Sequence, residues 1–529
     1  MAAPVNSVVA SLAGDRPGGG AGAGKVVLIG FMGAGKSTGA RSIADALGVD
    51  AVDVDAVLER GFGKTVTEIF AQDGEAAFRA AEARTAVELL NSPGGPGVIA
   101  LGGGAVMHSS VRDALAGQLV VWLDVAPELA WERCRGGGRP LAAERDDFLA
   151  RHREREPLYR ALADVIVPAA RSRELEPVLA AARGMPTGVR LLWAVSSSGD
   201  YPAYIGAGLL RSGFWPPTAP GRRFLVTDGH VGHRYADLLE PLAGRVAITP
   251  GEQSKTVAHA EIVWTELARA GLTRQDVVVA LGGGVVGDLA GFCAATYQRG
   301  VAYVQVPTTL VAQVDSAYGG KTGVDLEVAK NYVGAYHQPR AVVADTAALA
   351  TLPDAELASG YAEVLKTALI AGGDLWERVR TGADPTDAEV ICACALTKLR
   401  IVAADERDAG QRQVLNLGHT VGHAIETVTG YAAYRHGEAV GLGLLAALRL
   451  SGQDALREEV LELLRARGLP TTLAHADPAA VVMATARDKK RVGDGPVPFV
   501  LLERPGAARP GCVVPQRALA AAVRELAPA

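Results

Sequence analysis

The chain has 529 residues, of which 49% are hydrophobic and 21% are charged, and its formal net charge is −5 at pH 7. This length predicts more than one domain, and the apolar content is ordinary for a globular protein with an ample core. The slightly acidic balance argues against a general nucleic-acid binder. Five cysteines without a CxxC pair indicate reduced thiols in a cytoplasmic protein. The sequence contains no run of about 18 apolar residues, so we expect no membrane partner. The start of the chain also lacks the apolar core of a signal peptide.

A phosphate-binding loop follows the N-terminal 24 residues, which end in PGGGAGAG and are expected to form a flexible tail. The stretch KVVLIGFMGAGKST is typical of a strand, a glycine loop and a helix, and Gly30, Gly35, Lys36 and Ser37 fit GxxxxGK[ST]. In such a loop, backbone N–H groups close on phosphate oxygens at the positive end of the helix. Lys36 would reach the terminal phosphates, and the Ser37 hydroxyl would hold Mg²⁺.

Acidic and basic residues follow that can serve a small polar acceptor. Asp53 and Asp55 lie two apart at an expected strand end, although either could be a solvated turn residue. Arg79, Arg139 and Arg155 come later, in GEAAFRAAE, GRPL and REPLY, with the glycine run LGGGAV between the first two. Arginine pairs a carboxylate bidentately, and glycine permits close backbone approach to a ligand.

These phrases, in this order over about residues 25–180, resemble the shikimate kinase family. The resemblance implies a P-loop kinase-like parallel-sheet domain over 25–183 that phosphorylates shikimate with ATP. It implies that Ser37 and Asp53 organise Mg²⁺, that Asp55 orients the acceptor hydroxyl, and that Arg139 lies on a lid over ATP. The implied ATP-binding residues are Gly33, Ala34, Gly35, Lys36, Ser37, Thr38 and Arg139. The implied shikimate-binding residues are Asp55, Arg79, Gly103, Gly104 and Arg155.

A second glycine-rich segment follows an expected linker at 184–188, where GMPTG interrupts the pattern. The run RRFLVTD predicts a strand that ends at Asp228, a usual place for ribose recognition in an open α/β sheet. The run DVVVALGGGVVGDLAGF predicts a strand, a glycine loop and a helix, and Gly283 and Gly284 would let the backbone approach a pyrophosphate. A tight strand–helix turn without a ligand remains an alternative.

Histidines concentrate further along the chain. Three of the ten, His419, His423 and His436, fall within eighteen residues. His419 and His423 are four apart on a helical pattern and so share one face. A catalytic zinc usually takes three protein ligands, and Glu363 in SGYAEVLKTAL is the best candidate for a ligand from elsewhere. Alone, the histidine pair could equally be packing or surface residues.

The region from about residue 190 to 529 resembles the 3-dehydroquinate synthase family. The phrases that carry the resemblance are GEQSK, LGGGVVGDLAGF, PTTLVAQVDSAYGGKTGVD, KNYVGAYHQP, SGYAEVLKTA, ADERDAGQRQVLNLGHTVGHAIE, HGEAV and DKK. The resemblance implies an α/β NAD-binding subdomain over 189–352, a mainly helical metal-binding subdomain over 353–529, and a homodimer through this half. It also implies that Glu363, His419 and His436 hold zinc or cobalt, with His423 left free as a hydrogen-bonding residue or proton shuttle.

The same resemblance implies which residues bind NAD and substrate. The implied NAD-binding residues are Asp228, His230, Glu252, Lys255, Gly283, Gly284, Val285, Asp288, Thr308 and Thr309. The implied substrate-binding residues are Arg299, Asp315, Lys321, Lys330, Asn331, Lys366, Lys398, Arg412, Asn416, His423, Lys489 and Lys490. Lys366, Arg412, Asn416 and His423 are expected among the catalytic residues, together with Lys36, Asp55 and Arg139 of the kinase half. The several lysines and arginines in this set suit a ligand that carries both a phosphate and a carboxylate.

The implied synthase reaction converts 3-deoxy-arabino-heptulosonate 7-phosphate into 3-dehydroquinate with release of phosphate, and it uses NAD catalytically. The alternative is a metal- and NAD-dependent polyol dehydrogenase whose first domain is a nucleotide-sensing regulator. Such an enzyme would release NADH, and it would not need a set of lysines and arginines for phosphate. Because the kinase and synthase reactions are not consecutive in the shikimate pathway, we expect two kinetically independent sites.

Overall fold

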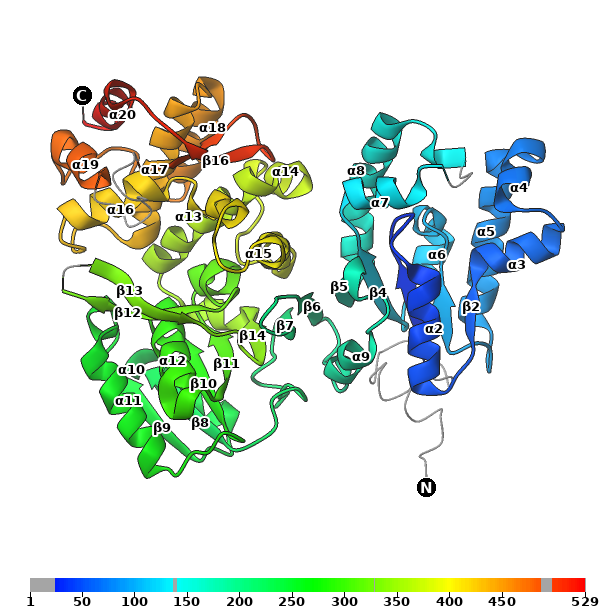
Figure 1. The fold of residues 1–529 in the computed structure, drawn as a ribbon, viewed down its shortest axis with the longest axis horizontal. Helices are drawn as coiled ribbons and strands as arrows, with labels where there is room; N and C mark the ends of the chain where they lie inside the picture. Colours follow the sequence, from blue (N-terminus) through cyan, green and yellow to red (C-terminus); the bar gives the residue numbers. More distant parts are fainter. Residues whose placement is uncertain (1–23, 137–139, 328, 487–496, 529) are drawn as a thin grey trace. The chain divides into compact units, whose positions relative to one another are not determined.

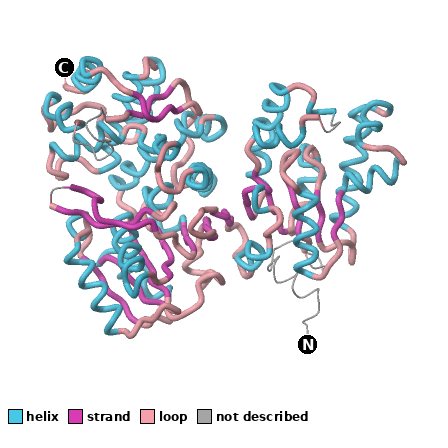
Figure 2. The backbone as a smooth tube through the Cα atoms, in the orientation of Figure 1, coloured by secondary structure: helices cyan, strands magenta, loops and turns pink. Residues whose placement is uncertain are grey.

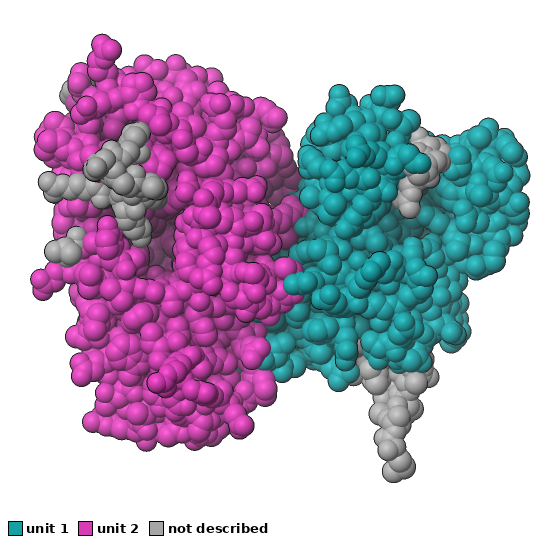
Figure 3. Space-filling model, in the orientation of Figure 1, with its two compact units in different colours: residues 1–194, 201–204, 211–218 teal, residues 195–200, 205–210, 219–529 magenta. Residues whose placement is uncertain are grey.

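The computed structural model describes residues 24–136, 140–327, 329–486 and 497–528. The chain divides into two compact units, drawn in teal and magenta in Figure 3. The first comprises residues up to 194 with 201–204 and 211–218, and the second comprises 195–200, 205–210 and the chain from 219 onward. Among the described residues, no helix is both long and apolar enough to cross a membrane.

The first unit is built on a parallel sheet with the strand order β2-β3-β1-β4-β5-β6 (Figure 1). Its strands are β1 (Val26–Ile29), β2 (Ala51–Asp53), β3 (Val98–Ala100), β4 (Leu119–Asp124), β5 (Val165–Pro168) and β6 (Arg190–Ala194). Most strand residues are apolar and buried, as expected for a parallel sheet covered on both faces. The helices are α2 (Lys36–Leu47), α3 (Val54–Phe62), α4 (Val66–Gln72), α5 (Gly74–Asn91), α6 (Ser109–Ala114), α7 (Pro127–Cys134), α8 (Arg145–Leu162) and α9 (Glu176–Ala182), with short turns η1 (Ala105–Met107), η2 (Pro140–Ala142) and η3 (Ala169–Arg171).

The α/β part of the second unit contains parallel strands in the order β14-β11-β10-β8-β9. These strands are β8 (Arg223–Asp228), β9 (Gly244–Ile248), β10 (Val277–Gly282), β11 (Ala302–Pro307) and β14 (Ala341–Asp345), and β7 (Tyr201–Gly206) precedes them in the chain. Strands β12 (Lys321–Leu326) and β13 (Ala329–Tyr336) form a separate antiparallel pair. The helices here are α10 (Gly229–Tyr235), α11 (Val257–Arg269) and α12 (Gly284–Thr296), with short elements η4 (Ala236–Leu239), η5 (Glu252–Ser254), η6 (Tyr297–Arg299), η7 (Ala312–Ser316) and η8 (Thr346–Thr351).

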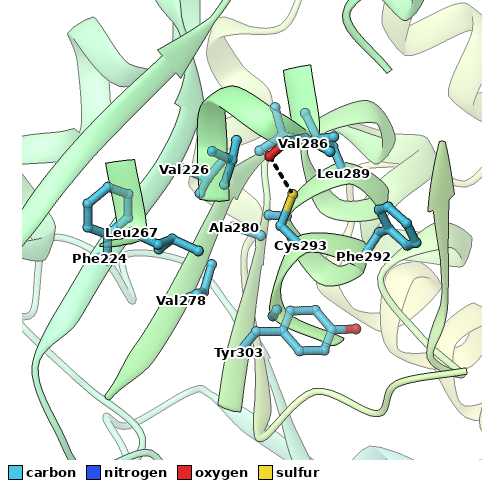
Figure 4. Close-up of a cluster of buried hydrophobic side chains, with 14 of the residues drawn as sticks. Phe224, Val226, Leu267, Val278, Ala280, Val286, Leu289, Phe292, Cys293 and Tyr303 are labelled. Atoms are coloured by element: carbon cyan, nitrogen blue, oxygen red, sulfur yellow. Dashed lines mark hydrogen bonds between the residues drawn. The ribbon is translucent and has the colours of Figure 1, made fainter. Parts of the chain in front are cut away.

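A buried apolar cluster holds α12 against this sheet (Figure 4). Val226 of β8 and Val278 of β10 meet Leu289 and Cys293 of α12, and Leu267 of α11 packs on the same cluster. Because α12 starts directly after β10, this packing fixes the glycine loop between them at the carboxyl edge of the sheet.

The remainder of the second unit is mainly helical (Figure 2). Its helices are α13 (Asp354–Ala371), α14 (Gly373–Arg380), α15 (Ala388–Ala404), α16 (His419–Val428), α17 (His436–Leu450), α18 (Asp454–Ala466), α19 (Pro478–Thr485) and α20 (Gln516–Arg524), with the short turn η9 (Gln411–Asn416). Strands β15 (Phe499–Leu502) and β16 (Ala508–Cys512) form an antiparallel pair. The predicted fold class is therefore confirmed: a parallel-sheet α/β domain is followed by an α/β part and a mainly helical part.

Close packing between α13 and α17 depends on Gly437. A Cβ atom at this position would lie 1.8 Å from the backbone oxygen of Ser359, far inside van der Waals contact. The Gly437 N–H also donates to the Ser359 hydroxyl at 3.0 Å. Since His436 precedes Gly437, this approach brings the first residue of α17 next to α13.

We predict that Gly437→Ala lowers the free energy of unfolding by about 2 kcal/mol, because the added methyl group forces α17 away from α13. Urea unfolding of the full chain measures this change. Gly229→Ala is the control, since a Cβ there would meet nothing within 4 Å. Equal unfolding midpoints for Gly437→Ala and Gly229→Ala would contradict the prediction.

Candidate active sites

The first candidate site lies in the first unit, between β1 and α2. Gly30, Gly33 and Gly35 have φ angles of +143°, +78° and +89°, which side chains other than glycine rarely adopt. Lys36 Nζ donates to the backbone oxygens of Gly30 and Phe31 at 2.9 and 3.1 Å, so the ammonium group lies over the loop. Ser37 is the second residue of α2, at the helix end where backbone N–H groups lack intrahelical partners. The loop can therefore hold phosphates.

Two acidic residues lie at the junction of β2 and α3. Asp53 ends β2, and its carboxylate caps α3 by accepting the Asp55 N–H at 3.0 Å. Asp55 lies beside the LGGGAV run, because a Cβ on Gly102 would be 2.9 Å from Asp55 Oδ1. The two aspartates thus take different positions, as their spacing predicts.

Two arginines flank the same glycine run. Arg79 of α5 pairs with Glu82, with Nη1 2.6 Å from Oε2, and a Cβ on Gly104 would lie 2.2 Å from this Nη1. Arg155 of α8 is buried and donates to the Gly103 oxygen at 3.3 Å. Among the described residues the buried Nε of Arg155 has no hydrogen-bond partner, which suits a group that meets a ligand.

Sequence reasoning omitted two supporting residues here. Glu82 is 1% exposed and orients Arg79. Tyr159 is 2% exposed, its hydroxyl donates to the Gly103 oxygen, and burial raises its pKa above the usual range, so it stays a neutral donor. The i,i+3 spacing of Arg79 and Glu82 was a usable signal, whereas nothing in the sequence marked Tyr159. Arg139 lies outside the described residues.

The second candidate site is a cavity of about 1010 Å³ within the second unit. All ten residues predicted to bind NAD line it. Asp228 ends β8 and caps α10. Gly283 joins β10 to α12, whose first residue is Gly284, and Thr308 and Thr309 follow β11. These positions share the carboxyl edge of the parallel sheet, where open α/β sheets bind nucleotides.

One wall of the cavity holds a buried ion-pair cluster. Lys255 Nζ lies 2.6 Å from Asp288 and 3.9 Å from Glu252. Burial alone would lower the pKa of Lys255, but these two carboxylates raise it above the usual range. Lys255 is therefore a fixed positive charge at the edge where the predicted nucleotide would lie.

Three predicted metal ligands meet at the helical side. Glu363 Oε1 lies 3.4 Å from His419 Nε2 and 3.2 Å from His436 Nε2, and one ligand atom from each residue lies within 4.8 Å of the others. Glu363 comes from the buried middle of α13, and the histidines are the first residues of α16 and α17. Two imidazoles and one carboxylate suit zinc or cobalt, so the donor set fits the predicted metal.

His423 lies near this cluster without joining it. Its ring centroid is 5.3 Å from that of His419 and 6.3 Å from that of His436, and it lines the cavity. One helical turn therefore separates the buried His419 from a histidine that can meet a ligand in the cavity.

The predicted substrate-binding residues do not all line the cavity. Asp315, Lys330, Asn331 and His423 line the cavity. Lys366 and Lys398 are buried behind it and both pair with Asp315, and Lys366 pairs with Glu363 as well. Burial alone would raise the pKa of Asp315, but Lys366 and Lys398 lower it to about 2.

Other predicted substrate residues are not among the described residues that line the cavity. Arg412 is buried and donates to the backbone oxygens of Glu406 and Gly319 at 2.5 and 3.0 Å. Lys321 pairs with Asp408, and Asn416 lines a separate cavity of about 10 Å³. Arg299 follows α12 with a φ angle of +68°. Lys489 and Lys490 lie outside the described residues.

The sequence reasoning also missed residues in this cavity, including Glu426, Tyr431 and Tyr434. Glu426 accepts a hydrogen bond from His436 Nδ1 at 3.4 Å, and its position seven residues after His419 was an available signal. The tyrosines had no comparable signal.

Comparisons with known proteins identify relatives of both parts of the chain. Residues 32–182 match the family model described as shikimate kinase, 245–359 match 3-dehydroquinate synthase N-terminal, and 360–491 match 3-dehydroquinate synthase C-terminal. The 3-dehydroquinate synthase of Halorhodospira halophila is 44% identical over 336 residues, which is 60% of this chain and 95% of that protein. The enzyme of the same name from Caulobacter vibrioides is 44% identical over 339 residues, covering 58% of this chain and 91% of that protein.

Solved structures resemble the second unit. The 2-epi-5-epi-valiolone synthase ValA of Streptomyces hygroscopicus subsp. jinggangensis, with NAD⁺ and Zn²⁺ bound, is 26% identical with a TM-score of 0.58. A 2-deoxy-scyllo-inosose synthase complexed with carbaglucose-6-phosphate, NAD⁺ and Co²⁺ is 25% identical with a TM-score of 0.57. Each match covers 63% of this chain and 99% of the other.

The paired state of Asp315 predicts a pH dependence of stability. With a folded pKa near 2 and an unfolded pKa of about 3.9, the ionised carboxylate stabilises the fold above about pH 4, and this contribution is lost as the pH falls toward 2. Asp315→Asn should therefore unfold more easily than the wild type at pH 7, by about 2–3 kcal/mol, with the difference shrinking as the pH falls. Urea unfolding at a series of pH values measures this.

The control for this experiment is Asp454→Asn. Asp454 is 68% exposed and pairs with Arg449 at the surface, so its replacement should change the free energy of unfolding by about 0.5 kcal/mol or less. A difference between Asp315→Asn and the wild type that does not vary with pH would contradict the assigned ion pairs.

Proposed function

Because the chain belongs to the 3-dehydroquinate synthase family and carries a shikimate kinase domain ahead of the synthase, we propose that its two candidate sites perform these two reactions. The protein is a bifunctional enzyme of the shikimate pathway. The first site phosphorylates shikimate with ATP to give shikimate 3-phosphate. The second converts 3-deoxy-arabino-heptulosonate 7-phosphate into 3-dehydroquinate and phosphate. We place the kinase at 25–183, the linker at 184–188 and the two synthase subdomains at 189–352 and 353–529.

The synthase assignment rests on one observation. Glu363, His419 and His436 lie close together, and His423 and His436 line the same cavity as the residues predicted to bind NAD. The structural relatives bind NAD⁺ with Zn²⁺ or Co²⁺, and we propose the same cofactors here. When bound, the metal would supply Lewis acidity and NAD⁺ would supply reversible hydride transfer. A polyol dehydrogenase would share the metal and the nucleotide, but two 3-dehydroquinate synthases are 44% identical to this chain over 336 and 339 residues.

The side chains around the cavity take complementary roles. Lys330 and Asn331 orient the substrate from β13, and His423 moves a proton at the cavity wall. Lys366 and Lys398 both pair with Asp315, which lines the cavity. Their positive charges stabilise the phosphate anion as it leaves the substrate. Arg412 acts from the same side by fixing the loops that carry Glu406 and Gly319.

The kinase roles follow from the loop geometry. Lys36 and the N–H groups of α2 hold the ATP phosphates, with Ser37 and Asp53 on Mg²⁺. Asp55 orients the acceptor hydroxyl, while Arg79 and Arg155 bind the shikimate carboxylate beside Gly103 and Gly104. A lid that carries Arg139 completes the proposed site.

We also propose a cytoplasmic enzyme that acts on small molecules, without nucleic-acid or membrane partners, and forms a homodimer through its synthase half. Five free cysteines, four of them buried, support a reducing compartment.

Metal content and turnover test the synthase assignment. Glu363→Gln should lose bound zinc and phosphate release together, because an anionic ligand is replaced by a neutral amide. His423→Ala should keep its zinc while turnover falls about 100-fold, since proton transfer typically contributes this much. Elemental analysis and phosphate release from the heptulosonate phosphate measure both. Zinc loss in His423→Ala would make it a ligand, and net NADH production by the wild type would favour the dehydrogenase.

The two sites should be separable by mutation. Lys36→Met should abolish shikimate-dependent ADP formation and leave phosphate release from the heptulosonate phosphate within about twofold of the wild type. His436→Ala should do the reverse. The reason is chemical, because neither reaction makes the other's substrate. Loss of both activities in either variant would contradict independence, and ADP formation that ignores shikimate would favour a nucleotide-sensing domain.

A further inference from the structure

Glu426 is a buried carboxylate that neither site assignment uses. It lies on α16, seven residues after His419, and is 4% exposed. A buried charge is costly unless it is paired or hydrogen-bonded. Its Oε1 accepts from His436 Nδ1 at 3.4 Å and lies 3.7 Å from Lys330 Nζ. Its partners are therefore a proposed metal ligand and a proposed substrate-binding lysine.

The two ring nitrogens of His436 face different carboxylates. Nε2 points to Glu363 Oε1 at 3.2 Å, and Nδ1 points to Glu426. A neutral imidazole carries its proton on one nitrogen, and a fixed acceptor beside Nδ1 keeps the proton there. The lone pair of Nε2 then points toward Glu363, where the proposed metal would bind.

His419 shows the same arrangement with a different acceptor. Its Nδ1 lies 3.2 Å from the backbone oxygen of Leu417, and its Nε2 lies 3.4 Å from Glu363 Oε1. Both histidines thus present Nε2 to Glu363 and give Nδ1 to an acceptor. A backbone oxygen serves His419, whereas His436 depends on a side chain that mutation can remove.

Lys330 connects this carboxylate to the opposite wall. Its Nζ lies 3.4 Å from Glu252 Oε1 on the nucleotide side and 4.2 Å from the ring centroid of Tyr431. The same Oε1 of Glu426 is near both Lys330 and His436. One carboxylate therefore meets the substrate side and the metal side of the cavity.

We propose that Glu426 is a positioning residue that holds His436 with Nε2 toward the metal and holds Lys330 over the cavity. This inference rests on the proposed synthase function and adds a residue to it. Acceptors that orient a metal-binding histidine typically contribute about 10–100-fold to metal affinity. The affinity of the site for zinc should therefore depend on a residue that is not a ligand.

Zinc affinity of the full chain, measured by competition with a chromophoric chelator, tests the proposal. Glu426→Ala should bind zinc about 10–100-fold more weakly than the wild type, and Glu426→Gln, which keeps an acceptor oxygen, should fall between them. The visible spectrum of bound Co²⁺ should shift in Glu426→Ala, because the orientation of the His436 ring changes. Glu462→Gln, at an exposed position of α18, should match the wild type in both measurements.

Wild-type zinc affinity and an unshifted Co²⁺ spectrum in Glu426→Ala would overturn the proposal. If the alanine variant fails to fold, Glu426→Gln takes its place in the test. Wild-type zinc affinity in Glu426→Gln, together with an unchanged KM for the heptulosonate phosphate, would also overturn the proposal.

Lys330→Met separates the two contacts of Glu426. The variant should raise the KM for the heptulosonate phosphate and leave zinc affinity within about twofold, because His436 keeps its acceptor. Zinc binding as weak as in Glu426→Ala would show that Glu426 acts through Lys330, against the proposal. If the wild type bound zinc no better than Glu363→Gln, the proposed metal site itself would fail, a result distinct from a failure of Glu426 alone.

Discussion

Four charges of alternating sign join the two parts of the second unit: Glu363, Lys366 and Lys398 are buried, and Asp315, whose side chain is 20% exposed, pairs with both lysines. Glu363 and Lys366 come from α13, Lys398 from α15, and Asp315 from η7 in the α/β part. Removing one member would leave its neighbour charged without a partner away from bulk water, which destabilises the fold. The row therefore restricts the α/β part and the helical part to one arrangement. Because Glu363 is also a proposed metal ligand, the same row places the metal site.

Local patterns in the sequence were sufficient where one segment contains the whole feature. The phosphate loop, its strand and its helix are contiguous, and the positive φ angles of Gly30, Gly33 and Gly35 follow from that motif. The residues that line the predicted NAD side of the cavity could also be predicted, because the carboxyl ends of parallel strands share one edge of a sheet. Fold class followed from the same strand and helix patterns.

Burial was harder to predict because it depends on pairings across the chain. Lys366 and Lys330 look alike as isolated lysines in apolar or glycine-rich stretches, yet Lys366 is 1% exposed behind the cavity and Lys330 lines it. Spacing places His419 and His423 on one helix face but does not say which of them meets Glu363. The role of Glu426 depends on the position of His436, which a loop separates from α16. The resemblance to known families implied the three metal ligands. Only the structure shows the residues that contact those ligands, such as Glu426 beside His436 and Lys366 beside Glu363.

Both sites hold their cations with carboxylates before any ligand arrives. Arg79 pairs with Glu82 in the first unit, and Lys255 pairs with Asp288 in the second. A paired cation attracts an anion less strongly than a free one, but its side chain has already lost its rotational freedom. Binding a phosphorylated or acidic ligand then requires little further ordering, so more of the interaction energy is available for orientation at the reacting atoms. Arg155 differs, since its Nε has no hydrogen-bond partner among the described residues, and a carboxylate ligand would satisfy that donor directly.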